Sequence, residues 1–336
     1  MFPDVSVVIP TYNRRSHLRR ALGTVLGQQG VRVEVIVVDD GSDDGTAEDM
    51  RRCADVGVRL IRHEESLGVC AARNAGIALA QASWIAFLDH DDLWAPNKLA
   101  AQLEMAGRAR PDGSRPEWVC CSSILVDEAD RLIGWASPGP RDIDAARLLV
   151  DGIVPGGGSG IMARADALRA IGGFDETMVP DEDWDVWIKL GLRGPAPIVD
   201  RPLMAYRVWS SSVSGRLQDF DSSRRRLTTR YASEAQRLHV RTDEAASHAY
   251  SAYRFLHAKR YKEAARSYRI LAELEDSRKA AMLGLSAQWG GPALHAHLLW
   301  RGRRRIPAAV RSEAEAWLAN VENNGRCWLG NLQPLG

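Results

Sequence analysis

The chain has 336 residues, 45% of them hydrophobic and 26% charged, so it can bury a full core and is long enough for two domains. Its five cysteines have neither metal nor redox spacing, and their odd number argues against a disulfide framework. The sequence also lacks an apolar run of about 18 residues that could span a bilayer.

The net charge of +1 hides an asymmetry between the two parts of the chain. Residues 222–336 hold 20 Lys+Arg and 10 Asp+Glu, which leaves the first 221 residues with a balance of −9. The arginines are spread over predicted helices with acidic interruptions, and no aromatic recognition motif joins them, so nucleic acid is not an expected partner. Because a strand is predicted almost at the first residue, we expect no signal peptide and a cytoplasmic location.

Apolar runs in the first 90 residues predict buried strands that end in polar side chains. They lie at residues 5–10, 33–38, 58–61 and 84–88. Apolar residues at helical spacing over 18–26 and a second helical segment at 71–80 lie between them, which predicts parallel, right-handed strand-helix-strand units. Ligands of such sheets bind at the carboxyl ends of the strands, so we expect the polar tips to form one site.

The run Asp89-His90-Asp91-Asp92 follows the last of these strands. Its carboxylates repel one another, and hard oxygen ligands two residues apart suit Mg²⁺ or Mn²⁺ carrying a phosphorylated ligand. Acidic turns of this kind are also found as plain solvated turns, so the run by itself leaves both interpretations open.

Two further segments are candidates for the reaction centre. The stretch 155–160 is the most glycine-rich in the chain, and glycine there either permits a positive φ or lets the backbone approach a ligand closely. A helix is predicted to begin near Asp181, with Glu182, Asp183 and Asp185 in its first turn. The helix dipole stabilises acids at this position. Together with Asp181 there are four carboxylates, which is more than capping needs, and one of them can serve as a general base.

Six motifs in one order, spread over roughly the first 210 residues, resemble the family 2 inverting glycosyltransferases of the GT-A fold. They are Val7-Val8-Ile9-Pro10-Thr11-Tyr12-Asn13, Val38-Asp39-Asp40-Gly41-Ser42, Gly68-x-x-x-Ala72-Arg73-Asn74-x-Gly76, Phe87-Leu88-Asp89-x-Asp91-Asp92, Gly172-Gly173-Phe174-Asp175-Glu176 and Glu182-Asp183-Trp184-Asp185. The resemblance implies an α/β domain with a Rossmann-like mixed sheet over residues 1–215. The residues that follow, 216–336, are predicted separately to form an all-α region.

The resemblance also implies roles for particular residues. Asp91 would coordinate a Mn²⁺ or Mg²⁺ ion that bridges the donor diphosphate, with Asp89 near the ribose or a metal-bound water. Asp183 would be the general base, and Glu182 and Asp185 remain alternatives because spacing does not say which carboxylate turns inward. The nucleotide would lie against Pro10, Thr11, Tyr12, Asn13, Asp39, Asp40, Arg73 and Asp89. The donor sugar or acceptor would lie against Gly157, Gly158, Ser159, Asp92, Glu182, Trp184, Arg207 and Trp209.

Two departures from the family pattern refine these expectations. Many relatives carry a histidine shortly after a Tyr-Arg pair, whereas Tyr206-Arg207-Val208 is followed here by Trp209, so no histidine metal ligand is expected there. The chain lacks the Gln-x-x-Arg-Trp motif of processive members, so we expect it to add a single sugar.

The sequence therefore predicts a metal-dependent enzyme that moves one sugar from a nucleotide-diphosphate sugar, most simply a UDP-sugar, to an acceptor hydroxyl or other nucleophile on a peptide, protein or natural product. A nucleotidyltransferase is one alternative, although such enzymes normally carry a Gly-rich phosphate loop where this chain has Thr11-Tyr12-Asn13. A noncatalytic helical scaffold with an inactive transferase domain is another, disfavoured because Asp91 and Asp183 are both present.

The C-terminal region is predicted to be helical. The pattern from His248 to Leu271, with aromatic residues around the small Ala264, resembles one tetratricopeptide helix pair. A single pair needs neighbours for stability, so we expect it to pack on the catalytic domain, on later helices or on a second copy of the chain. A plain helical cap, a docking module for a peptide or protein acceptor, and a homodimer interface all fit this pattern.

Overall fold

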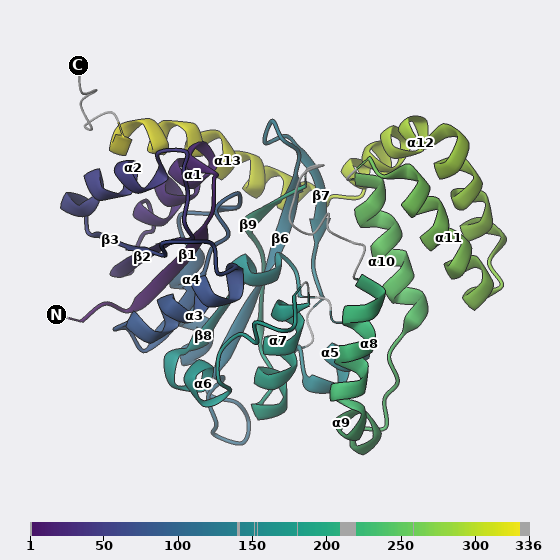
Figure 1. Cartoon of the computed structure of the whole chain (residues 1–336), viewed down its shortest axis with the longest axis horizontal. Helices are drawn as coiled ribbons and strands as arrows, with labels where there is room; N and C mark the ends of the chain where they lie inside the picture. The colour runs from purple at the N-terminus through teal and green to yellow at the C-terminus, as the bar shows by residue number, and fades with distance from the viewer. Residues whose placement is uncertain are drawn as a thin grey trace.

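The computed structural model describes residues 2–139, 142–150, 152, 154–179, 181–208, 220–257 and 259–329. Within these residues a mixed nine-stranded sheet forms the centre of the first part of the chain (Figure 1). The strands are β1 (Val5–Thr11), β2 (Val33–Asp39), β3 (Val58–Arg62), β4 (Trp84–Phe87), β5 (Leu93–Trp94), β6 (Trp118–Val126), β7 (Leu132–Ala136), β8 (Ile161–Arg164) and β9 (Ile198–Arg207).

The strand order is β3-β2-β1-β4-β8-β6-β9-β5, with β7 paired to β6. The first four strands are parallel, as the strand-helix-strand pattern predicts, and β8 is antiparallel to both β4 and β6. The carboxyl ends of β1, β2 and β4 therefore meet at one edge, and their polar tips lie together there.

Helices cover both faces of the sheet because each central strand is buried on both sides. The helices before the C-terminal region are α1 (Arg15–Leu26), α2 (Thr46–Arg52), α3 (Val69–Leu79), α4 (Lys98–Gly107), α5 (Ala145–Val150), α6 (Ala165–Ala170) and α7 (Glu182–Arg193). Alternate residues of β1 point to opposite faces of the sheet and pack into different cores. Val7 and Ile9 belong to the core with α1 and α4, whereas Val8 belongs to the core with α3 and α7.

A glycine allows the closest approach between a helix and the sheet. A Cβ atom at Gly76 of α3 would lie 2.3 Å from Cγ1 of Val8 in β1, so α3 can rest on β1 only with glycine at this position. This contact matters for the site, because α3 also carries Arg73 and Asn74.

The C-terminal region is helical, as predicted. It comprises α8 (Phe220–Arg230), α9 (Ala232–Arg237), α10 (Glu244–His257), α11 (Tyr261–Glu275), α12 (Arg278–Arg304) and α13 (Ala308–Leu329). Helices α10 to α12 share a core of their own and stand to one side of the sheet, with a kink in α12 at Gly290 (Figure 1). None of the helices in the described ranges is long and apolar enough to cross a membrane.

The last helix returns to the first part of the chain. In Figure 1, α13 runs beside α1 and away from α11 and α12, the two helices that precede it in the sequence. Trp317 donates a hydrogen bond through Nε1 to the carbonyl oxygen of Pro202 in β9 at 2.9 Å, and Arg201 pairs with Glu313 at 2.6 Å. Helices α8 to α13 thus contribute to three cores, two of them shared with the first part of the chain, and a domain boundary near residue 215 stays a prediction.

Candidate active site

The candidate site lies where the loop after β4, the glycine turn η2 (Gly157–Gly160) and the start of α7 come together. The backbone N–H of Asp89 donates to Oγ of the buried Ser159 at 3.0 Å, which fixes the loop to the turn. The N–H of Gly158 donates to Asp183, which fixes the turn to α7. A Cβ at Gly157 would approach Oδ2 of Asp183 to 3.5 Å, so glycine leaves room beside this carboxylate.

Arg73 is the cation at the centre of the site. Its side chain is only 3% exposed, and it donates to Oδ1 of Asp183 at 2.7 Å and to Oδ1 of Asp89 at 2.8 Å. Oε1 of Glu182 lies 3.6 Å from the same guanidinium, and the ring of Phe174 lies 5.0 Å below it. One buried guanidinium therefore joins the acidic run after β4 to the acids that begin α7.

The two acids beside Arg73 have perturbed protonation. Burial raises the pKa of Glu182 to about 7, the charge of Asp183 adds to this rise, and Arg73 opposes it. Burial also raises the pKa of Asp183, again against the effect of Arg73. Oε2 of Glu182 is buried without a hydrogen-bond partner among the described residues. Both carboxyl groups are therefore stronger bases than ordinary surface acids.

Asp185 belongs to a different network, although it is only two residues beyond Asp183. Its side chain is fully buried and accepts from Tyr231 at 2.7 Å and from Arg230 at 3.0 Å, while Lys189 lies 2.6 Å away. These contacts join α7 to α8 and α9. Asp185 is thus a structural ion-pair partner, on the side of α7 away from Arg73.

The acidic run after β4 is partly exposed and partly buried. Asp89 keeps 28% of its side chain exposed, and Asp91 is half-buried. Asp92 is buried and accepts the backbone N–H of Arg207 at 3.0 Å, and burial together with the charges of Asp91 and Asp89 raises its pKa well above the usual range. Its second oxygen, Oδ2, has no hydrogen-bond partner among the described residues.

The donor chemistry of this run fits a divalent cation. In the described part of the chain, no group of three or more His, Cys, Asp or Glu side chains forms a ready metal cage. Mg²⁺ and similar ions need only one or two protein carboxylates when substrate phosphates complete the coordination. Asp89 and Asp91 supply such carboxylates at the open sheet edge.

Arg207 is buried among protein groups. Its Nε donates to the carbonyl oxygen of Asp91 at 2.9 Å, and its guanidinium pairs with Asp130 at 2.5 Å. It thereby ties the loop after β4 to the β6–β7 hairpin. Trp209, which is predicted to contact the donor sugar or the acceptor, lies outside the described residues.

Trp184, next to Asp183, is also buried. Its Nε1 donates to the carbonyl oxygen of Leu148 at 2.6 Å, and its indole occupies the space that a Cβ at Gly152 would need. The indole therefore packs α7 against the segment from α5.

The tips of β1 and β2 form the other end of the site. Asp39 is fully buried, accepts the N–H of Ser42 at 3.0 Å and pairs with Arg62 at 3.0 Å. Asn13, with a left-handed φ of 50°, donates its N–H to Oγ of Ser42 at 2.9 Å. Oγ1 of Thr11 is buried without a hydrogen-bond partner in the described chain. These contacts link the two strand tips and leave the Thr11 hydroxyl available to a ligand.

The other residues predicted at the nucleotide have simpler surroundings. Tyr12 is 49% exposed, and the carbonyl oxygen of Pro10 lies 3.3 Å from Nδ1 of His90. Asp40 accepts from Ser66 and His63 and from two backbone N–H groups, and these hydrogen bonds outweigh burial and hold the pKa of Asp40 below its usual range. Asp40 thus shapes the loop that leads into α3.

Three residues that support the glycine turn are absent from the sequence-based predictions. Nε1 of Trp94 donates to the carbonyl oxygen of Ser159 at 3.0 Å, and Nε2 of Gln102 donates to that of Gly160 at 3.0 Å. The buried Lys98 donates to Gln102 at 2.8 Å and lies 3.8 Å from the Trp94 ring, and burial lowers the pKa of Lys98 to about 8. The available signal was a lysine and a glutamine four residues apart on an otherwise apolar helix face.

Comparison with known proteins identifies relatives of the first part of the chain. Residues 6–170, just under half of the chain, match the sequence model of Glycosyl transferase family 2. The chain is 44% identical over 107 residues to the Succinoglycan biosynthesis protein ExoO of Rhizobium meliloti (strain 1021), which is 32% of this chain and 31% of that protein. It is 36% identical over 101 residues to the UDP-Glc:alpha-D-GlcNAc-diphosphoundecaprenol beta-1,3-glucosyltransferase WfgD of Escherichia coli, which is 30% of this chain and 40% of that protein. The matches thus span less than half of either relative.

A solved structure supports the fold over the whole chain. The crystal structure of S. aureus TarS 1-349 aligns with a TM-score of 0.54, covering 98% of this chain and 90% of that chain at 16% identity. The mixed sheet is therefore of the GT-A type, which confirms the predicted fold class.

Proposed function

We propose that this protein is an inverting glycosyltransferase that moves one sugar from a UDP-sugar to an acceptor hydroxyl. The observation that carries the proposal is the pair of contacts made by Arg73, 2.7 Å to Asp183 and 2.8 Å to Asp89. They bring a candidate base and a candidate donor-phosphate motif to one guanidinium. The Escherichia coli relative is a UDP-Glc glucosyltransferase by name, which supports a uridine nucleotide as donor.

The nucleotide would bind at the tips of β1 and β2. The buried Thr11 hydroxyl lacks a hydrogen-bond partner among the described residues, which is costly unless a ligand supplies one. The carboxylate of Asp39 lies beside it at the strand ends and can accept a base N–H. Pro10, Tyr12 and Asn13 would complete this end of the site.

The diphosphate would lie at the acidic run, where Asp91 and Asp89 would hold Mn²⁺ or Mg²⁺. When bound, the ion supplies a Lewis acid that stabilises the departing nucleoside diphosphate. Arg73 would keep Asp89 oriented at this position. Asp92 would hold the loop in shape through its contact with the backbone of Arg207.

Asp183 would take the proton from the acceptor hydroxyl as that oxygen attacks the anomeric carbon. Its raised pKa makes it a better base at neutral pH, and the bond to Arg73 fixes its Oδ1 so that Oδ2 is the oxygen left to face the space above Gly157. Glu182 is the remaining alternative, because Asp185 is engaged with Arg230, Tyr231 and Lys189.

The acceptor would be a growing glycan. The succinoglycan and diphosphoundecaprenol relatives support polysaccharide biosynthesis as the setting. Because the matched part covers only the first half of the chain, the C-terminal helices are where specificity for this acceptor would be added.

The test is calorimetric titration of UDP with and without Mn²⁺ in the wild type, in Asp91→Asn and in a control, Asp55→Asn, which removes an exposed carboxylate far from the acidic run. We expect Mn²⁺ to strengthen UDP binding in the wild type and the control but not in Asp91→Asn. Equal metal dependence in all three proteins would contradict the metal assignment. Release of pyrophosphate instead of UDP from a sugar nucleotide would favour a nucleotidyltransferase.

A further inference from the structure

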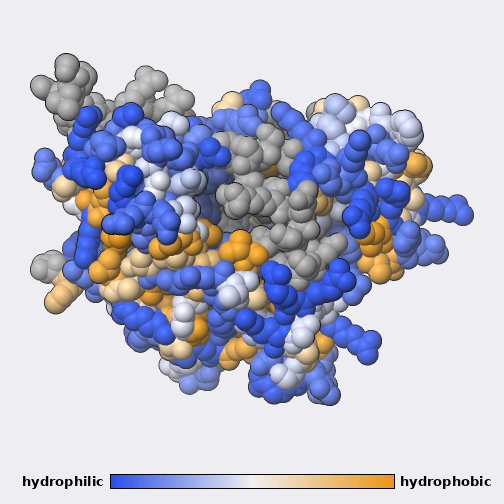
Figure 2. Space-filling view, in the orientation of Figure 1, coloured by the Kyte–Doolittle hydropathy of each residue, from blue (hydrophilic) through white to orange (hydrophobic). Residues whose placement is uncertain are grey.

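An exposed apolar stripe runs along α12. Trp289 is 82% exposed, Met282 69% and Leu285 60%, so the described part of the chain leaves all three open to solvent. They are three and four positions apart and therefore lie on one side of the helix. Helices α11 and α12 lie side by side at the outer edge of the molecule, away from β1 to β3 (Figure 1). The surface over α12 is paler than the blue, hydrophilic surface around it (Figure 2). Exposed apolar side chains that lie together mark a surface for interaction.

A basic stripe lies on the neighbouring helix. In α11, Lys262, Arg266 and Arg269 are exposed at spacings of four and three positions. Glu263 of the same helix pairs with Arg260 at 2.8 Å, and the other acids of α11 come after Arg269, toward the end of the helix. The sequence of α12 contains no Asp or Glu over its 27 residues. The stripe is therefore a cationic surface beside an uncharged one.

The packing of α11 on α12 puts both stripes on one face of the pair. A Cβ at Gly284 would lie 3.4 Å from Cβ of Tyr268, and a Cβ at Gly291 would lie 2.3 Å from Cγ of Tyr261. The two helices thus run antiparallel with these residues between them. The basic stripe begins one position after Tyr261, and Leu285 of the apolar stripe comes one position after Gly284. One position turns a helix by about 100°, and in an antiparallel pair this turn leads to the same side in both helices.

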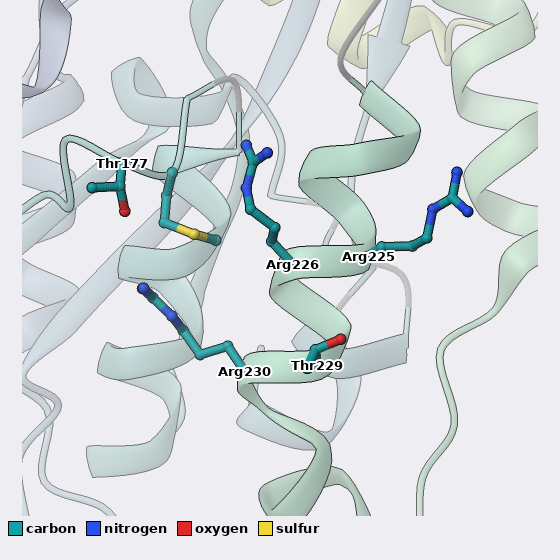
Figure 3. A pocket seen from close by; sticks show the side chains of 6 residues that line it. Thr177, Arg225, Arg226, Thr229 and Arg230 are labelled. Atoms are coloured by element: carbon teal, nitrogen blue, oxygen red, sulfur yellow. The ribbon is translucent and has the colours of Figure 1, made fainter.

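The arginines of α8 are a different case, because they make contacts within the protein. Arg226 and Arg230 reach across a cleft toward the loop that carries Thr177 (Figure 3). Arg230 pairs with Asp175 at 2.8 Å, and Arg226 donates to the carbonyl oxygen of Val179 at 3.3 Å. The three cations of the α11 stripe, by contrast, form no ion pair in the described part of the chain. Their charge is available to a partner.

We propose that this face of α11 and α12 binds the surface of an anionic lipid bilayer. A strip of apolar side chains that includes a tryptophan, with Lys and Arg beside it, is typical of helices that lie in a membrane interface. Trp289 and Leu285 would enter the headgroup region, where indole rings are favoured. The cations of α11 would lie against the lipid phosphates, and each strengthens binding about fivefold. A second copy facing the same surface would bring like charges together, so charge favours the anionic partner.

The test is sedimentation of the full chain with vesicles of equal parts phosphatidylglycerol and phosphatidylcholine, and with vesicles of phosphatidylcholine alone. We expect the wild type to bind the mixed vesicles and to be released by added salt, which screens the lipid phosphates. Lys262→Gln with Arg266→Gln and Arg269→Gln should weaken binding about 100-fold. Trp289→Ser should weaken it about tenfold, because the indole no longer leaves water.

Two controls change matched groups elsewhere on the surface. Arg52→Gln with Arg237→Gln and Arg241→Gln removes the same number of exposed charges outside α11 and α12. Phe2→Ser removes an aromatic side chain that is 81% exposed, as Trp289→Ser does. Both controls should bind the mixed vesicles as the wild type does. Circular dichroism checks that each variant is folded.

Several results would overturn the proposal. The wild type alone refutes it if it binds neither kind of vesicle, or binds both equally and without regard to salt. Equal losses in the stripe variants and their controls would indicate a general effect of charge or of exposed aromatic residues. A larger mass in light scattering without vesicles, lost in Trp289→Ser, would assign the face to a second copy of the chain. Because no sugar donor is present, these outcomes do not depend on the transferase function, which UDP release tests separately.

Discussion

Replacing Glu182 with glutamine should change how stability depends on pH. Glu182 is mostly buried, and burial and Asp183 raise its pKa from 4.5 to about 7 in the folded protein. A carboxyl group with a raised pKa binds more protons in the folded than in the unfolded state between these values. Its contribution is therefore present at low pH and is lost as the pH rises through this range. At 1.36 kcal/mol for each pKa unit, the loss amounts to about 3 kcal/mol by pH 8.

Glu182→Gln keeps the shape of the side chain and removes the titration. We expect the free energy of unfolding of the variant to exceed that of the wild type by up to about 3 kcal/mol at pH 8, and the two to converge near pH 4.5. Urea unfolding of the metal-free protein across this range measures the difference. Acids with lowered pKa values, such as Asp4 and Asp175, change the stability with pH in the opposite direction. They are present in both proteins, so their contribution cancels in the difference. A constant difference between the two proteins from pH 5 to 8, or a less stable variant at pH 8, would refute the reasoning.

Two further substitutions test the packing around the site. Gly76→Ala places a Cβ 2.3 Å from Val8 and should destabilise the protein by about 1–3 kcal/mol in urea unfolding, whereas Gly107→Ala, which meets no atom within 4 Å, should be neutral or slightly stabilising. Equal stability of the two variants would show that α3 can move away from β1. Asp185→Asn should cost about 2 kcal/mol, less than a fully buried pair because Lys189 and Arg230 are partly exposed, and it should leave UDP affinity unchanged. Loss of UDP binding in this variant would place Asp185 in the nucleotide site.

Local patterns explain why the framework of the site was predictable. The apolar runs that form β1, β2 and β4 are buried on both faces of the sheet, and parallel connections bring their polar tips to one edge. The glycine turn and the acids of α7 were also recognisable, because glycine content and helix-start acids are features of short segments.

Long-range pairing explains what the sequence could not predict. Arg73 meets Asp183 across 110 positions, and Arg207 meets Asp92 across 115, so their partners depend on the complete fold. The sequence likewise could not distinguish Asp183 from Asp185. Residues two positions apart on a helix point about 200° away from each other, so one of these two acids had to face away from the site. Only the position of α8 shows that this acid is Asp185.

The return of α13 to the first core has the same cause. Trp317 contacts Pro202 across 115 sequence positions, so this contact too depends on the complete fold. The tetratricopeptide-like character of α10 and α11 stays a prediction, as do the docking and dimer roles suggested for them.

The central claim is that Asp183 is the base of a glycosyl transfer, and turnover of Asp183→Asn tests it most directly. The assay measures UDP release from UDP-glucose with a glycan acceptor and Mn²⁺, alongside the affinity for UDP, with Asp185→Asn as a matched control in the same helix. The account predicts that Asp183→Asn lowers turnover by about 10²-fold or more while UDP affinity stays within a few-fold of the wild type, and that the control keeps its turnover. Wild-type turnover in Asp183→Asn, or an equal loss in Asp185→Asn, would contradict it.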